Sequence, residues 1–335
     1  MSANPRSGRR VFVLGATGTI GRAVVAELLA SRYDVTCFVR QRADAAGSLS
    51  PAEVQDRLSG AAIRYGNPID AASLVRDGFA GERYDVLVSC LASRTGHPAD
   101  AWAVDYHGHV AALAAAQEAG VQHMVLLSAI CVQWPQLAFQ HAKLKFEQEL
   151  MQSGLRYAIV RPTAYFKSLS GQLKRVQDGK PYLLFGDGQL TACKPISDRD
   201  LARYIVSCLE DSSCRNAVLP IGGPGPAITP LEQGRQLFRM VGRKPKFRHL
   251  PVAVLDWIVG ALSVLGRVSP ALADKAELAR IGRYYATQSM LVRDPATGVY
   301  SADATPSFGS DRLFDYYAEL LSGRLSDERG DHAVL

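Results

Sequence analysis

The stretch Val11-Phe-Val-Leu-Gly15-Ala-Thr-Gly18-Thr-Ile-Gly21 and the residues that follow it decide the fold of this chain. An apolar run ends at Gly15, and the segment 22–31 after Gly21 has the composition of a helix. A strand that turns directly into a helix leaves free N–H groups at the helix N-terminus, and glycines let a pyrophosphate approach that backbone closely. The pattern therefore predicts a dinucleotide site. The residues that we expect to contact the dinucleotide here are Gly15, Thr17, Gly18, Thr19, Ile20 and Gly21.

The next predicted strand, residues 34–40, indicates which dinucleotide binds. An acidic side chain at its end would hydrogen-bond the ribose hydroxyls of NAD, but the chain has Arg40 there and Arg42 close behind. A guanidinium suits a 2′-phosphate because it offers several donors in a fixed plane. We therefore expect NADPH as the cofactor, with Arg40 and Arg42 at its 2′-phosphate. The alternative is that both arginines are solvated loop residues.

Strands and helices alternate along the chain in the way that a Rossmann-type, doubly wound parallel α/β sheet requires. Further strands are predicted at residues 61–65, 84–91, 123–128, 156–161 and 217–221. Helices are predicted at residues 51–59, 105–119, 137–152 and 198–210. The alternation breaks after Pro162, which indicates two portions. The first is an NADPH-binding domain over residues 1–164, to which 195–222 return, and the second is a smaller, mainly helical substrate portion made of 165–194 and 223–335.

Composition narrows the class of protein. The 335 residues are 47% hydrophobic and carry a formal net charge of +6, which suits a large buried core and an anionic ligand such as NADPH. No dense basic run with interleaved aromatic residues indicates nucleic-acid binding, so no nucleic-acid partner is expected. The six cysteines lack metal-ligand spacing, and no apolar signal segment precedes Val11. We expect reduced thiols, no metal site and a cytoplasmic location.

One lysine is predicted to act at the cofactor. Four residues of the helix over 137–152 share one face: Phe139, Lys143, Phe146 and Leu150. A partly buried ammonium needs a polar partner, and the cofactor ribose hydroxyls would supply one for Lys143. The alternative is a lysine whose stem packs on the core while its ammonium reaches solvent.

Other site residues are predicted from their positions, because ligands bind at the carboxyl ends of parallel strands. The cofactor contacts expected at these ends are Leu91, Ala92, Ser128, Pro162 and Thr163. The substrate contacts expected there are Ile130, Cys131, Phe139, Tyr165 and Phe166. Lys143 and Tyr165 are the candidate catalytic residues. Each of these positions could equally serve packing.

Several segments resemble a known family. The glycine turn and Lys143 resemble atypical short-chain dehydrogenase/reductases related to NmrA and isoflavone reductase. More specific segments lie at residues 126–133, 139–147, 194–198, 218–225, 229–233, 281–286 and 289–291. Together they resemble the divinyl chlorophyllide 8-vinyl-reductases, over residues 11–321. The resemblance implies NADPH-dependent reduction of the 8-vinyl group of a divinyl chlorophyllide-type tetrapyrrole to ethyl in (bacterio)chlorophyll synthesis.

One departure from the wider superfamily bears on mechanism. The usual Tyr-x-x-x-Lys pair is Phe139-x-x-x-Lys143 here, so the phenol that protonates an alkoxide in carbonyl reduction is missing. Reduction of a vinyl group forms no alkoxide, which is consistent with Phe139, although loss of catalysis is consistent with it too. Two other classes therefore stay open. One is an NmrA-type redox sensor or assembly protein, and the other is an isoflavone-reductase-like enzyme for a smaller aromatic substrate.

The apolar segment 251–268 is predicted to be a buried core helix. A thin polar stripe that includes Asp256 and Ser263 interrupts it, and the clean apolar run is too short for a membrane span. The alternatives are a wall of the pigment pocket and a weak peripheral contact with a photosynthetic membrane. No feature of the sequence indicates an oligomeric state.

Overall fold

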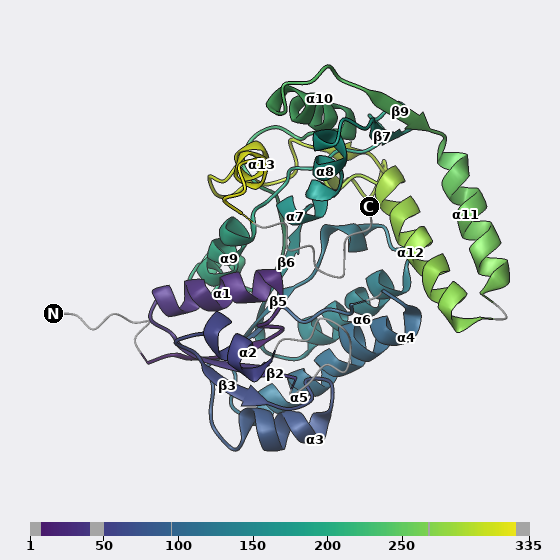
Figure 1. Ribbon diagram of the computed structural model, residues 1–335. Helices are drawn as coiled ribbons and strands as arrows, with labels where there is room; N and C mark the ends of the chain where they lie inside the picture. Colours follow the sequence, from purple (N-terminus) through teal and green to yellow (C-terminus); the bar gives the residue numbers. More distant parts are fainter. Residues whose placement is uncertain (1–7, 41–49, 95, 267–268, 326–335) are drawn as a thin grey trace.

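The computed structural model describes residues 8–40, 50–94, 96–266 and 269–325 (Figure 1). Its centre is a seven-stranded sheet with the order β3-β2-β1-β4-β5-β6-β8, in which every neighbouring pair is parallel. The strands are β1 (Arg10–Leu14), β2 (Asp34–Val39), β3 (Ala62–Tyr65), β4 (Val86–Ser89), β5 (His123–Leu127), β6 (Arg156–Pro162) and β8 (Ala217–Ile221). The strand order reverses between β1 and β4, where doubly wound sheets bind ligands. The predicted α/β fold is confirmed.

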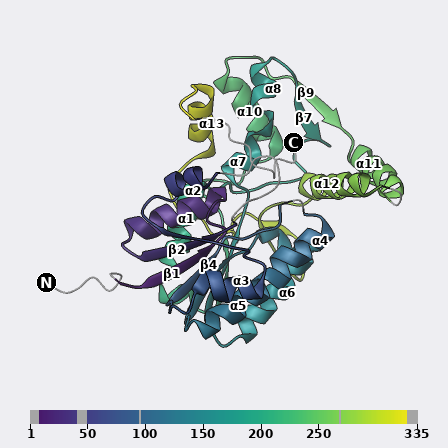
Figure 2. The same cartoon turned by 60° about the horizontal axis from the view of Figure 1, so that its bottom comes forward.

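Helices cover both faces of the sheet (Figures 1 and 2). Side chains alternate along β1, so that Val11 and Val13 enter one buried cluster while Phe12 and Leu14 enter the other. The first cluster lies under α1 (Thr19–Ala30), α2 (Pro51–Arg57) and α9 (Asp198–Ser207). The second lies under η1 (Leu74–Phe79), α5 (His109–Glu118) and α6 (Ala138–Gln152). Burial on both faces explains why the central strands β1, β4 and β5 are mostly apolar.

The helix predicted at residues 105–119 begins earlier than expected. It starts as α4 (Pro98–Ala101) and continues through a wider, π-type segment η2 (Trp102–Gly108) into α5. Asp105 therefore lies inside a helical segment and not at its first residue, where an acidic side chain would serve the helix dipole. Its burial, described below, has another cause.

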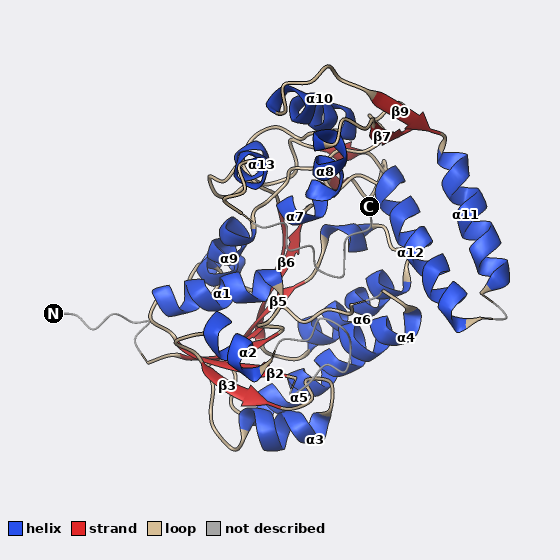
Figure 3. Cartoon of the chain, viewed as in Figure 1, coloured by secondary structure: helices blue, strands red, loops and turns tan. Residues whose placement is uncertain are grey.

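A second group of elements, mostly helical (Figure 3), has its own core. It contains α7 (Phe166–Leu169), η4 (Ser170–Gln172), α8 (Leu173–Gln177), β7 (Tyr182–Phe185), α10 (Pro230–Met240), β9 (Phe247–Leu250) and α13 (Leu313–Leu321). β7 and β9 pair in parallel as a separate two-stranded sheet. The remaining short elements are α3 (Ala71–Ser73), η3 (Ile130–Gln133), η5 (Ser212–Cys214), β10 (Val292–Arg293) and β11 (Tyr300–Ser301). The domain boundary after residue 164 stays a prediction.

The helices α11 (Val252–Leu265) and α12 (Pro270–Thr287) pack against each other at the edge of the molecule, with α11 outermost (Figures 1 and 2). No residue of α11 is buried, and the Trp257 side chain is 81% exposed. The prediction of a buried core helix is therefore wrong, because α11 packs mainly on α12 and has its other side in solvent. Within the described residues, no helix has the length and apolarity needed to cross a membrane.

Candidate cofactor and substrate site

Steric overlap explains two of the three glycines in the turn between β1 and α1. Gly15 has a φ of +74°, and a Cβ on it would overlap the backbone of Cys90 and Leu91. A Cβ on Gly21 would overlap the carbonyl oxygen of Gly15, so α1 can begin close to the strand only with glycine there. Gly18 differs, because a Cβ on it would meet only the Gly15 oxygen, at 3.4 Å. The turn itself therefore does not need glycine at position 18.

The N-terminus of α1 fits an anion. Gly18 is its N-cap and offers no side chain, and the first turn holds no acidic residue. The N–H groups of Thr19, Ile20 and Gly21 have no partner within the helix, and the helix dipole adds partial positive charge. Lys167 of α7 adds a cation at this end, with its Nζ 3.2 Å from Oγ1 of Thr19. These groups can hold the pyrophosphate of a dinucleotide.

A polar cavity of about 480 Å³ lies beside the carboxyl ends of β2 and β3. Its lining residues are Arg40, Gly66, Asn67, Asp70, Ser73, Arg76 and Asp77. Both carboxylates accept hydrogen bonds from neighbouring groups. Asp70 accepts a bond from the backbone of α3, and Arg76 and Ser73 hold the pKa of Asp77 below its usual value. Arg40 is exposed at the rim, as a contact to a ribose phosphate requires, and Arg42 lies outside the described residues.

Lys143 has a partner that sequence reasoning missed. Its Nζ donates to Oδ1 of Asp105 at 2.9 Å, and the two side chains are 11% and 0% exposed. Ser93 Oγ donates to the other carboxylate oxygen at 2.6 Å. A carboxylate within the protein thus satisfies part of the burial requirement that we assigned to the ribose alone. An ammonium has three donors, so Lys143 can still bind a ribose hydroxyl.

A cluster of phenols and thiols surrounds Cys131, which follows β5. The Tyr285 hydroxyl of α12 lies 3.9 Å from its Sγ, and the Tyr284 hydroxyl donates to its carbonyl oxygen at 2.9 Å. Burial raises the pKa of Tyr165, and the neighbouring Cys90 and Cys131 raise it further. Tyr165 and Cys131 therefore lie close enough to influence each other, and Tyr285, which the sequence did not indicate, lies beside Cys131.

Ser128 and Thr163 are buried, and protein groups hold their hydroxyls. Ser128 Oγ donates to Glu147 at 2.5 Å, and Glu147 forms a buried ion pair with Arg161. Thr163 donates to the carbonyl oxygen of Lys194. The neighbouring Pro162 is also buried. The backbone N–H groups of Ser128 and Thr163 are also bonded, to the carbonyl oxygens of Val160 and Ile221. Cofactor contacts at these positions would therefore have to use carbonyl oxygens or the remaining acceptor sites of the hydroxyls.

The predicted substrate residues divide among three clusters, and Tyr165 packs against the first cluster of the sheet. Phe139 is 9% exposed and packs with Ile130 and Cys131 against α12. Phe166 belongs to the second core instead, where its ring centroid lies 5.7 Å from that of Tyr316. The structure therefore places Phe166 in a different cluster from Ile130, Cys131 and Phe139. After β4, Leu91 is half-buried and Ala92 is exposed.

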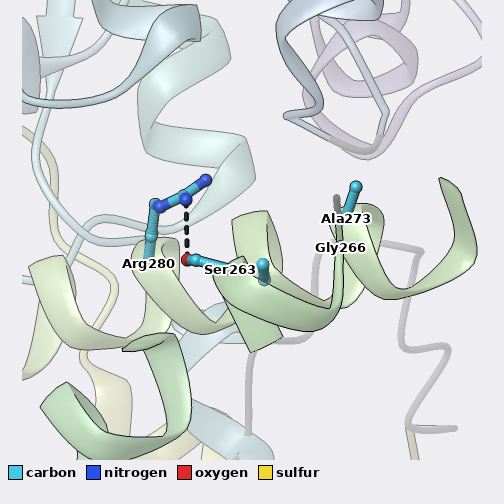
Figure 4. A pocket seen from close by; sticks show the side chains of 5 residues that line it. Ser263, Gly266, Ala273 and Arg280 are labelled. Atoms are coloured by element: carbon cyan, nitrogen blue, oxygen red, sulfur yellow. Dashed lines mark hydrogen bonds between the residues drawn. The ribbon is translucent and has the colours of Figure 1, made fainter. Parts of the chain in front are cut away.

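A small pocket of about 190 Å³ lies between α11 and α12 (Figure 4). Ser263, Gly266, Ala273, Ala276 and Arg280 line it, and Arg280 donates to Ser263 Oγ at 2.8 Å. Pockets for drug-sized ligands start near about 300 Å³, so this one is too small for a tetrapyrrole.

The sheet topology, the glycine turn and the free helix N-terminus define a nucleotide-binding protein of the Rossmann class. Residues 15–212 match the NAD(P)H-binding family, which makes a nicotinamide dinucleotide the cofactor. The chloroplastic divinyl chlorophyllide a 8-vinyl-reductase of Cucumis sativus is 48% identical over 99% of this chain and 80% of its own length. That of Arabidopsis thaliana is 46% identical over 96% and 79%. The chain belongs to the divinyl chlorophyllide a 8-vinyl-reductase family and is an NAD(P)H-dependent oxidoreductase.

A solved structure supports the fold assignment. The Escherichia coli NADPH-dependent quinone oxidoreductase QOR2, in complex with NADPH, aligns with a TM-score of 0.63 over 93% of this chain and 99% of its own. The two sequences are 19% identical, so this likeness concerns the fold alone.

Proposed function

We propose that this protein reduces the 8-vinyl group of a divinyl chlorophyllide-type tetrapyrrole to ethyl, with NADPH as the reductant. The observation that carries the proposal is the 48% identity to the cucumber reductase over 99% of the chain. This similarity extends well beyond residues 15–212, which any NAD(P)H-binding relative would match. It includes the elements around Tyr165 and α12 that would meet a substrate.

The preference for NADPH over NADH rests on Arg40. Among the described residues at the end of β2 none is acidic, and Arg40 lines a cavity in which Asp77 is paired with Arg76. The pyrophosphate would bind the turn from Gly15 to Gly21. The further proposed contacts are Thr17, Thr19, Ile20, Arg42, Leu91, Ala92, Ser128, Pro162 and Thr163.

Lys143 would orient the nicotinamide ribose, and Asp105 would position Lys143. Asp105 is fully buried and is fixed by Ser93, so it holds the ammonium in one place. Bound NADPH supplies a hydride, and one proton from the protein or solvent completes the conversion of vinyl to ethyl. Burial raises the pKa of Tyr165 and Tyr285, so both phenols are protonated at neutral pH and are weaker acids than a free phenol. Either could give a proton only to a strongly basic carbanion.

The proposed substrate contacts are Ile130, Cys131, Phe139, Tyr165 and Phe166. Of these, Ile130, Cys131 and Phe139 form one apolar wall. The wall supplies positioning, because placing the vinyl carbon beside the hydride donor can by itself lower the barrier by several kcal/mol.

The proposal is tested by incubating the purified protein with divinyl chlorophyllide and either NADPH or NADH, then separating the pigments by chromatography. We expect the monovinyl product with NADPH and much less with NADH. Protein that binds NADPH but leaves the pigment unchanged would be a binding protein of the sensor or assembly class. Turnover of smaller aromatic substrates alone would indicate the isoflavone-reductase-like class.

A further inference from the structure

Helix α11 has two apolar sides, and one of them has no partner in the described protein. The half-buried residues recur on the side toward α12: Val252, Leu255, Val259 and Leu262. The exposed apolar residues lie on the other side: Val254, Trp257, Ile258, Ala261, Val264 and Leu265. A contiguous exposed apolar face that includes a tryptophan marks an interaction site, because monomeric proteins rarely leave one in water.

The polar side chains of α11 do not lie on this exposed apolar face. Asp256 forms an ion pair with Arg283 of α12, and Ser263 accepts a bond from Arg280. Both polar side chains are therefore used beside α12. The outward face carries no charged residue.

The segment that leads into α11 is basic. Arg243, Lys244, Lys246 and Arg248 are all exposed, and no acidic residue occurs over residues 241–255. β9, which holds Arg248, ends two residues before α11 begins. Figure 1 shows β9 beside the first turn of that helix. The apolar face thus has a cluster of positive charges at one end.

We propose that the outward face of α11 and the basic segment 243–248 bind the surface of a membrane that contains anionic lipids. The helix lies in the plane of the interface, with Trp257 and its neighbours at the boundary between headgroups and acyl chains, and the four cations meet lipid phosphates. The 14 residues of α11 are too few to cross a bilayer core of about 30 Å.

Charge distinguishes this occupant from a second copy of the chain. A two-fold dimer presents the same patch from both subunits, so contact through α11 would bring two basic segments to one interface. An anionic membrane complements that charge instead.

Binding of α11 to a membrane would place the substrate end of the site near the bilayer. α12, on which α11 packs, carries Tyr284 and Tyr285 to Cys131 at the substrate end of the site. If the proposed function holds, a pigment dissolved in the bilayer enters the site beside the docked helix.

The test measures binding to vesicles without cofactor or pigment, so failure of the proposed reaction leaves its result untouched. Full-length protein is sedimented with vesicles of phosphatidylcholine alone, or of phosphatidylcholine with roughly one third phosphatidylglycerol. We expect binding to the anionic vesicles, with weakening at high salt. Brominated lipids should quench Trp257, with Trp102→Phe and Trp134→Phe removing the other two indoles.

Two variants locate the surface. Trp257→Glu should reduce the bound fraction at least fivefold, whereas Val299→Glu, at a residue 61% exposed elsewhere, should not. The double variant Lys244→Glu/Lys246→Glu should weaken binding about tenfold or more, since each cation contributes roughly fivefold. Lys145→Glu on α6 is its control. Absence of vesicle binding, equal binding by Trp257→Glu and Val299→Glu, or a dimer that only Trp257→Glu dissociates would overturn the proposal.

Discussion

The two ends of the cofactor site are built differently. At the β1–α1 turn, backbone atoms make the site and glycines at positions 15 and 21 are required by overlap alone. At the other end, the side chains of Ser93, Asp105 and Lys143 make it, through bonds between separate elements. A site made of backbone tolerates no added atoms but is visible in a short stretch of sequence. A site made of side chains depends on partners that the sequence does not bring together.

The largest effect is expected at the backbone end, from Gly18→Val. The backbone of Gly18 is extended, with φ −70° and ψ 165°, and its Cβ would clear the protein, so the fold should persist. Binding of both NADPH and NADH should weaken by roughly a hundredfold or more, as charged hydrogen bonds to the pyrophosphate are lost. Fluorescence titration measures this loss, with circular dichroism to verify folding. Gly260→Ala, in open space on α11, is the control. Normal binding by Gly18→Val would place the pyrophosphate elsewhere.

At the side-chain end, Lys143→Ala should lower kcat by about a hundredfold, because a cofactor displaced by about 1 Å loses that much. Lys145→Ala on the exposed side of the same helix should keep its activity. The variant should also be less stable by about 3–5 kcal/mol, since Asp105 then keeps a buried charge without a partner. Urea denaturation measures this second effect. An active Lys143→Ala protein would leave the lysine with a structural role only.

A variant of Arg40, the proposed contact of the 2′-phosphate, tests the choice between NADPH and NADH. Arg40→Asp should weaken NADPH binding roughly ten- to a hundredfold while NADH binding changes little, since one charge-assisted contact is lost. Arg32→Asp removes an exposed arginine at the opposite edge of the sheet and should change neither. Dissociation constants for both cofactors decide the outcome, and equal losses would make Arg40 an ordinary loop residue.

A pH dependence is expected from the buried His109, which bonds Ser89 Oγ and the carbonyl oxygen of Val104. Burial, assisted by the Lys143 ammonium, lowers its pKa from 6.5 to about 4. Between pH 4 and pH 6.5, His109 therefore binds a proton in the unfolded chain but not in the folded protein. The free energy of unfolding should therefore fall as pH drops from 6.5 to 4, by roughly 2–3 kcal/mol for this residue.

Urea denaturation at several pH values measures this slope. His109→Asn should flatten it, and His141→Asn, at an exposed position, should not. His123 has a similarly lowered pKa of about 4, so part of the slope persists in His109→Asn. An unchanged slope in His109→Asn would contradict the assignment.

The smallest effect is expected from Phe139→Tyr, which restores the phenol usual in the superfamily. The vinyl reaction forms no alkoxide, so kcat should change by no more than about twofold. A cost in thermal stability is expected instead, because the new hydroxyl enters an apolar cluster. A large gain in activity would show that a phenol at this position serves the reaction.

Most of the fold could be predicted, because local patterns decide it. The strand expected at residues 217–221 is β8 as observed, and the helix expected at 137–152 is α6 within one residue. The glycine turn could be predicted without knowledge of tertiary contacts. The side-chain end of the site could not. Asp105 and Lys143 lie 38 positions apart, and Tyr285 lies 154 positions from Cys131. Local periodicity in the sequence cannot predict contacts between residues so far apart.

Helix α11 shows the opposite error. Its apolar composition predicted a buried helix, but no residue of α11 is buried, and the side that meets α12 is only half-buried. Composition does not tell how many neighbours a helix will have. Trp257 is exposed because the fold places nothing over it among the described residues.

The salt bridge between Lys143 and Asp105 has an electrostatic consequence for the redox couple. The oxidised and reduced nicotinamide rings differ by one positive charge, and a lone buried ammonium would repel the oxidised ring in a medium that screens poorly. If Lys143 binds the ribose as proposed, the carboxylate of Asp105 at 2.9 Å offsets most of that charge. The pair would then bias the two oxidation states less than a lone ammonium would.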